Sequence, residues 1–174
     1  TGNIGVNVAE RLRGMGAAKI IGLNRSGKAN PAFDEVHPIS ALDTLLPTTQ
    51  TLIMALPGTA ETEHILNRER IALLPQNAYV INVGRGSAID QEALMDALNH
   101  DQLAGAALDV FVPEPLPEDH PLWETKNLIV TPHISGNLTL GYTRDINVAM
   151  FCEDLANYAA GRPLQQLVDR KLGY

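Results

Sequence analysis

The chain has 174 residues, 45% of them hydrophobic, and a formal net charge of −7 from 13 Lys and Arg against 20 Asp and Glu. This composition is typical of a globular domain, and its acidity argues against nucleic acid or an anionic membrane as a partner. No apolar run is long enough for a transmembrane helix, and the first residues do not resemble a signal peptide. The single cysteine, Cys152, and the lack of metal-ligand spacing lead us to expect a cytoplasmic protein without a metal.

Short apolar runs alternate with amphipathic segments along the chain. The runs are rich in Ile, Leu, Val and Ala without polar alternation, which is typical of strands in a parallel sheet covered on both faces. The predicted strands are Lys19–Leu23, Thr51–Leu56, Ala78–Asn82, Gly105–Val110 and Leu128–Val130.

Helical patterns lie between and after these strands. The predicted helices are one with Ile4, Val8 and Leu12 on one face, Leu66–Leu74 before Pro75, Gln91–His100 capped by Asp90, and Asn137 to about Ala160. On the last helix we expect Cys152 to be a buried small hydrophobe. Alternating strands and helices predict an α/β fold with a doubly wound, Rossmann-type parallel sheet.

The chain opens within a glycine pattern. A dinucleotide-binding turn reads G-x-G-x-x-G, and Gly2 and Gly5 fit its second and third glycines. The first glycine and the strand feeding the turn would precede Thr1, so we expect a sheet lacking its first strand, in a fragment of a longer chain. A native start with a degenerate loop is the alternative. Gly2, Asn3 and Ile4 are candidate pyrophosphate contacts at the start of the first helix.

The end of the first predicted strand is the candidate ribose site. NAD-binding proteins usually have an Asp or Glu there, whereas this chain has Asn24, Arg25, Ser26 and then Lys28. Because a guanidinium and a hydroxyl can bind a 2′-phosphate, these residues favour NADP(H). The alternative interpretation is a solvated turn, since turns prefer the same residue types.

Four later segments carry a family resemblance. They are Asn82–Gly86 (NVGRG), Leu108–Leu116 (LDVFVPEPL), His120–Trp123 (HPLW) and Thr131–Gly136 (TPHISG). With them the chain resembles, over nearly its whole length, the D-isomer-specific 2-hydroxyacid dehydrogenases, which include glyoxylate/hydroxypyruvate reductases and D-3-phosphoglycerate dehydrogenases. The resemblance implies a cofactor lobe at residues 1–136 and a helix and tail at 137–174 that return toward a substrate lobe.

Reduction of a 2-keto acid needs a cation for the carboxylate, a hydride donor and an acid for the carbonyl oxygen. The resemblance assigns the carboxylate to Arg85, the acid/base role to His133, and the orientation of the histidine to Glu114. Without it, Arg85 reads as a surface residue of a glycine-flanked turn and Glu114 as an acidic loop residue. The resemblance also implies cofactor contacts at Leu56, Pro57, Thr62, Val83, Gly84, Asp109, Ser135 and Gly136, with Asp109 on the nicotinamide carboxamide.

The expected function is therefore hydride transfer between NAD(P) and a D-2-hydroxy or 2-keto acid. Two alternatives remain open: an NAD(H)-sensing, corepressor-like binding protein, and a non-catalytic cofactor-binding fragment. The resemblance further implies a homodimer, and we expect the fragment alone to be inactive.

Overall fold

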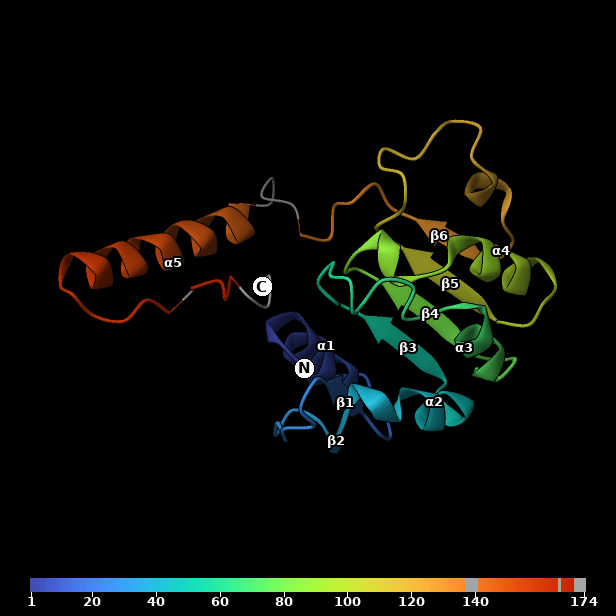
Figure 1. Cartoon of the computed structure of the whole chain (residues 1–174), viewed down its shortest axis with the longest axis horizontal. Coiled ribbons are helices and arrows are strands. Elements are labelled where there is room, and N and C mark those ends of the chain that lie inside the picture. Colours follow the sequence, from blue (N-terminus) through green and yellow to red (C-terminus); the bar gives the residue numbers. More distant parts are fainter. Residues whose placement is uncertain (137–140, 166, 171–174) are drawn as a thin grey trace.

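The structure, a computed structural model, describes residues 1–136, 141–165 and 167–170. It contains two parallel sheets with helices around them (Figure 1). The smaller sheet pairs β1 (Ile21–Asn24) with β2 (Glu35–Pro38). The larger sheet has the order β3-β4-β5-β6, formed by Thr51–Met54, Tyr79–Asn82, Gly105–Leu108 and Leu128–Val130.

Helices connect and follow these strands. The α-helices are α1 (Asn3–Gly14), α2 (Leu42–Leu45), α3 (Arg68–Leu73), α4 (Gln91–Asn99) and α5 (Gly141–Ala159). Short 3-10 helices occur at Ile39–Ala41, Leu46–Thr48, Gly86–Ala88 and Pro121–Glu124. The predicted cap of α4 is confirmed, because the Asp90 carboxylate accepts a hydrogen bond of 3.0 Å from the backbone N–H of Ala93.

The predicted α/β class with parallel strands is confirmed. In the doubly wound order 3-2-1-4-5-6, β2 and β1 take the first two places and β3, β4 and β5 take the last three. Among the described residues no strand lies at the central place, so the sheet is divided there. Two elements were not predicted: β2 is polar and half-exposed and ends in Pro38, and α2 has only four residues.

One face of the larger sheet carries the core. Leu94 and Leu98 of α4 are fully buried in a cluster with Val80 and Leu108 of the strands. The opposite row, which the strand register aligns, is less covered: Ile53, Ile81, Ala107 and Ile129. Ile129 is 66% exposed. Among the described residues the predicted covering is therefore complete on one face only.

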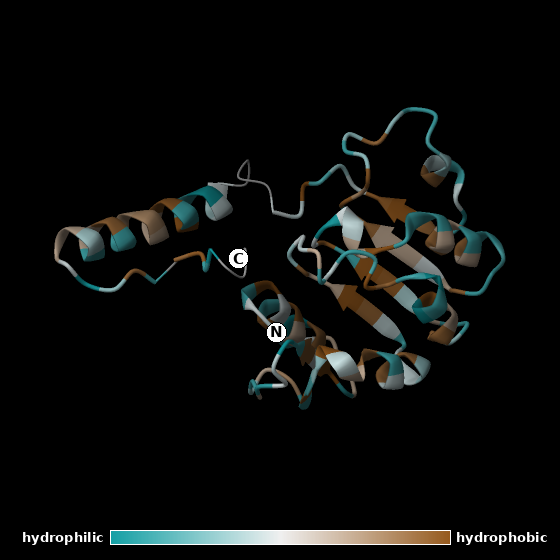
Figure 2. Cartoon of the chain, viewed as in Figure 1, coloured by the Kyte–Doolittle hydropathy of each residue, from teal (hydrophilic) through white to brown (hydrophobic). Residues whose placement is uncertain are grey.

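Helix α5 projects away from the sheets (Figure 1), and hydrophobic residues alternate with hydrophilic ones along it (Figure 2). Its exposed large apolar residues are Tyr142, Ile146, Val148, Phe151, Leu155 and Tyr158. The prediction of a buried Cys152 is wrong, because Cys152 is exposed on this projecting helix. Residues 137–140 of the predicted helix lie outside the described residues. No described helix is long and apolar enough to cross a membrane.

Candidate active site

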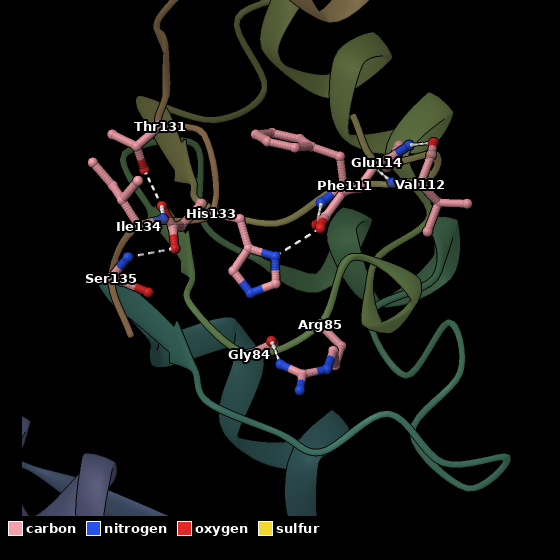
Figure 3. Close-up of polar contacts among 11 residues, drawn as sticks. Gly84, Arg85, Phe111, Val112, Glu114, Thr131, His133, Ile134 and Ser135 are labelled. Atoms are coloured by element: carbon pink, nitrogen blue, oxygen red, sulfur yellow. Dashed lines mark hydrogen bonds and ion pairs between the residues drawn. The ribbon is translucent and has the colours of Figure 1, made fainter. Parts of the chain in front are cut away.

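Three predicted site residues follow three neighbouring strands. Arg85 comes after β4, Glu114 after β5 and His133 after β6. Because the carboxyl ends of parallel strands meet at one edge of a sheet, these segments converge there. Figure 3 shows the ring of His133 between Glu114 on one side and Arg85 on the other.

The histidine and the glutamate form a close pair. His133 Nδ1 lies 2.6 Å from Glu114 Oε2, and the other carboxylate oxygen accepts a 2.8 Å hydrogen bond from the backbone N–H of Phe111. Burial raises the pKa of Glu114, but the Phe111 N–H and the His133 ring outweigh it, so the pKa lies below its usual value. Glu114 is therefore ionised at neutral pH and fixes the orientation of the ring.

A residue missed from the sequence holds the glutamate loop. Gln91, the first residue of α4, accepts a 2.9 Å hydrogen bond from the Val112 N–H and donates one of 2.6 Å to the Val112 carbonyl. This two-bond contact ties the loop before Glu114 to the start of α4, whose inner face is buried in the core. Nothing in the local sequence marks it, because the contact joins segments from two different connections of the sheet.

The turn that presents Arg85 is built from a buried amide and close backbone contacts. The side chain of Asn82, 1% exposed, accepts from the Gly84 N–H at 3.0 Å and donates to the Arg85 carbonyl at 2.9 Å. A Cβ on Gly84 would lie 2.6 Å from the backbone nitrogen of Leu56. The guanidinium of Arg85 folds back onto the Gly84 carbonyl at 2.8 Å (Figure 3).

Asp109 organises the turn that carries the histidine. Its Oδ1 accepts hydrogen bonds from the Thr131 hydroxyl at 2.5 Å and the Ile134 N–H at 2.9 Å, and its Oδ2 accepts from the Ser135 N–H at 2.9 Å. These bonds hold His133 in a left-handed backbone conformation, with φ 53°, which non-glycine residues rarely adopt. The contact of Asp109 with a nicotinamide carboxamide stays a prediction.

The hydrogen bonds also stabilise the ionised form of Asp109. Burial raises its pKa, but bonds from the Ser135 and Thr131 hydroxyls and from two backbone N–H groups outweigh it and lower the pKa to about 2. Because the folded pKa is below the ordinary value of 3.8, this contribution to stability is complete above about pH 4 and is lost as the pH falls toward about 2.

Replacement of Asp109 by Asn is therefore expected to lower the free energy of unfolding by about 2 kcal/mol at neutral pH, since one pKa unit corresponds to about 1.4 kcal/mol. Urea unfolding of the unchanged protein and of Asp109→Asn, at several pH values from neutral to acid, measures the difference between their free energies of unfolding. The difference should shrink as the pH falls below about 4. A difference that stays constant across the acid range contradicts the assignment.

The start of α1 suits an anion. Gly2 caps the helix without a side-chain hydrogen bond, and the first turn has no acidic residue. A Cβ on Gly2 would meet nothing within 4 Å, and Ile4 is 56% exposed. The backbone N–H groups of Gly2, Asn3 and Ile4 lie at the positive end of the helix dipole, where helices bind anions, and their contact with a pyrophosphate stays a prediction.

The turn after β1 is braced by Asn24. Its Oδ1 accepts from the Ser26 and Gly27 N–H groups at 3.0 and 2.6 Å, and its Nδ2 donates to the carbonyl of Lys28 and the hydroxyl of Thr1, both at 3.0 Å. Asn24 is thus committed to the turn itself. Arg25 and Ser26 are exposed in the same turn, where a ligand can reach them.

The loop after β3 is braced in a similar way. The Thr62 hydroxyl donates to the Pro57 carbonyl at 2.6 Å and accepts from the Thr59 N–H at 3.0 Å. The same loop brings Glu61 to Arg25, with 3.4 Å between Oε2 and Nη2. The segment Asn24–Lys28 contains no Asp or Glu. The fold instead brings the carboxylate of Glu61, from the loop after β3 of the larger sheet, next to Arg25.

This topology is that of the Rossmann-type nucleotide-binding proteins. In them, polar side chains gather at the carboxyl edge of the sheet, beside the N-terminus of a helix that can bind an anion. Residues 1–135 match the family described as D-isomer specific 2-hydroxyacid dehydrogenase, NAD binding domain, and the chain belongs to this family.

Several named proteins are similar to the chain. Glyoxylate/hydroxypyruvate reductase A of Klebsiella pneumoniae (strain 342) is 37% identical over 174 residues, covering 99% of this chain and 54% of that protein. The crystal structure of an NADPH-dependent glyoxylate/hydroxypyruvate reductase from Sinorhizobium meliloti, in complex with NADP and sulfate, superposes with a TM-score of 0.89 at 31% identity, covering 100% of this chain and 55% of that one. A D-isomer specific 2-hydroxyacid dehydrogenase family protein from Aeromonas salmonicida gives a TM-score of 0.86 at 37% identity, over 97% of this chain and 53% of that one. The chain thus spans about half the length of these relatives.

Proposed function

We propose that the chain is the cofactor-binding part of an NAD(P)-dependent oxidoreductase that interconverts 2-keto acids and D-2-hydroxy acids. The observation that carries this proposal is the His133–Glu114 pair at 2.6 Å, which lies beside Arg85 at the carboxyl edge of the sheet. The names of the similar reductases, and the NADP in one of their structures, support it.

Each of the three side chains has one task in this reaction. The planar guanidinium of Arg85 binds the substrate carboxylate with two parallel hydrogen bonds. Protonated His133 donates a proton to the carbonyl oxygen, and in the oxidative direction the neutral ring accepts it. The charge of Glu114 stabilises the imidazolium and holds Nδ1, so that Nε2 faces the substrate. A bound reduced nicotinamide supplies the hydride to the carbonyl carbon, which balances the two electrons of the reduction.

The cofactor would lie along the carboxyl edge of both sheets. The pyrophosphate binds at Gly2, Asn3 and Ile4, and the adenosine end binds at Arg25 and Ser26, in the turn that Asn24 braces. The remaining proposed contacts are Leu56, Pro57, Thr62, Val83, Gly84, Asp109, Ser135 and Gly136. Because Arg25 can pair with a 2′-phosphate, NADP(H) is the favoured form.

The organisation of the chain is also a proposal. Residues 1–136 form the cofactor lobe, and residues 137–174 extend toward a substrate lobe, which would cover the apolar side chains of α5. We expect a homodimer in the cytoplasm. The exposed Ile129 on the outer strand β6 and the half-exposed Trp123 in the 3-10 helix Pro121–Glu124 support the dimer. The molar mass measured by light scattering at native length tests it, and a monomer mass contradicts it.

The reaction can be tested directly in the protein at its native length. Oxidation of NADPH is followed with glyoxylate and with hydroxypyruvate, and dinucleotide binding is measured separately. Turnover with either acid supports the proposal. Dinucleotide binding without turnover of any 2-keto acid favours a sensing role instead, and absence of binding contradicts both.

A further inference from the structure

Two loops from different sheets meet at the proposed ribose site. Arg25 lies in the turn after β1, and Glu61 lies in the loop between β3 and α3. Their side chains form an ion pair of 3.4 Å between Arg25 Nη2 and Glu61 Oε2. This contact joins the two sheets across their carboxyl edge, where the cofactor is proposed to bind.

Both partners are accessible to a ligand. The side chain of Arg25 is 47% exposed and that of Glu61 is 76% exposed. The side chain of Asn24 is already hydrogen-bonded to its own turn and to Thr1, so it does not compete for the ligand. Arg25, Ser26 and Lys28 are the exposed polar residues of the turn beside the proposed ribose site, and Glu61 is the carboxylate next to Arg25.

A carboxylate at this place acts differently on the two dinucleotides. It neutralises the guanidinium and repels a 2′-phosphate, which carries a charge close to −2. Toward NAD(H) it can instead accept a hydrogen bond from a ribose hydroxyl, as the Asp or Glu at the strand end does in many NAD-binding proteins. The sequence places no such acid at the end of β1, and the fold brings one from the loop after β3.

We propose that Glu61 is a specificity-determining residue for the cofactor, which competes with the 2′-phosphate of NADP(H) for Arg25 and supports the binding of NAD(H). This inference rests on the proposed function, because it needs a dinucleotide at this site. The effect should be moderate, since ion pairs between exposed side chains are weak and are screened by salt.

The test compares Glu61→Gln with Glu63→Gln in the protein at its native length. Glu63 lies two residues further along the same loop and is also exposed, so it controls for the loss of one negative charge. The dissociation constants of NADPH and NADH are measured by fluorescence titration at low and high salt. Glu61→Gln is expected to shift the ratio of the two constants about three- to tenfold toward NADPH, and less at high salt. Glu63→Gln should leave the ratio within about twofold of the unchanged protein.

The role of Arg25 is separated by a double-mutant cycle. In an Arg25→Ala background, Glu61→Gln should shift the ratio of the NADPH and NADH dissociation constants clearly less than in the unchanged protein. The reason is that the guanidinium for which the Glu61 carboxylate and the 2′-phosphate compete is absent. Three results overturn the inference while the proposed function stands: the ratio of the two dissociation constants shifts equally in both backgrounds, does not change in Glu61→Gln, or changes as much in Glu63→Gln as in Glu61→Gln. Failure of the unchanged protein to bind either dinucleotide overturns the proposed function, and this inference with it.

Discussion

Replacement of His133 by Gln is expected to lower kcat for 2-keto acid reduction by about 100- to 10,000-fold, the usual contribution of a positioned general acid. Glutamine is similar in size and can still hydrogen-bond to Glu114, but it cannot release a proton to the carbonyl oxygen. The dissociation constant of NADPH should change by less than about twofold, because the proposed dinucleotide contacts of the helix start and the Asn24 turn remain. Steady-state kinetics and a fluorescence titration of the same preparation measure both quantities.

His100→Gln is the matched control for this variant. His100 follows the last residue of α4, and its Nδ1 lies 2.8 Å from the carbonyl of Asp96, within its own helix. We expect kcat of this variant to stay within about twofold of the unchanged enzyme, as for a surface substitution away from the site. Full turnover in His133→Gln, or an equal loss in both variants, would remove His133 from the proposed mechanism.

The sequence was enough to predict that the candidate site residues lie close together, because this follows from the topology of the sheet. Arg85, Glu114 and His133 each come after an apolar run, and parallel strands bring such positions to one edge. Strands β1, β3, β4, β5 and β6 followed from the same apolar runs, whereas the polar strand β2 was missed because it has no such run. The roles of the three residues still depend on the family resemblance, since a single Arg, Glu or His after a strand has many uses.

The supporting contacts could not be predicted, because they join distant segments through side-chain geometry. Gln91 reaches the Glu114 loop, and Glu61 reaches Arg25, without any local pattern that marks either residue. The exposure of Cys152 was missed for a related reason. The apolar residues of α5 indicate a helix that needs a partner, but the pattern does not say which part of the protein provides one.

The second large effect is expected at Gly86, where the segment after β4 lies directly against the Phe111 backbone after β5. A Cβ on this glycine would lie 2.2 Å from both the carbonyl carbon and the carbonyl oxygen of Phe111. Neither backbone can yield easily, because Phe111 is buried and its N–H is bonded to Glu114. Gly86→Ala is therefore expected to lower the free energy of unfolding by about 3 kcal/mol, at the upper end of the cost of overpacking.

Gly14→Ala is a suitable control for the same chemical change. Gly14 is the last residue of α1, and a Cβ there would meet nothing within 4 Å. Because alanine is favoured over glycine in a helix, this variant should be unchanged or more stable by about 0.5 kcal/mol. Urea midpoints of the two variants give the comparison. A Gly86→Ala midpoint equal to that of the unchanged protein would mean that the two strand ends can separate. In that case, the close contact between Gly86 and Phe111 is not what keeps Arg85 near the Glu114 loop.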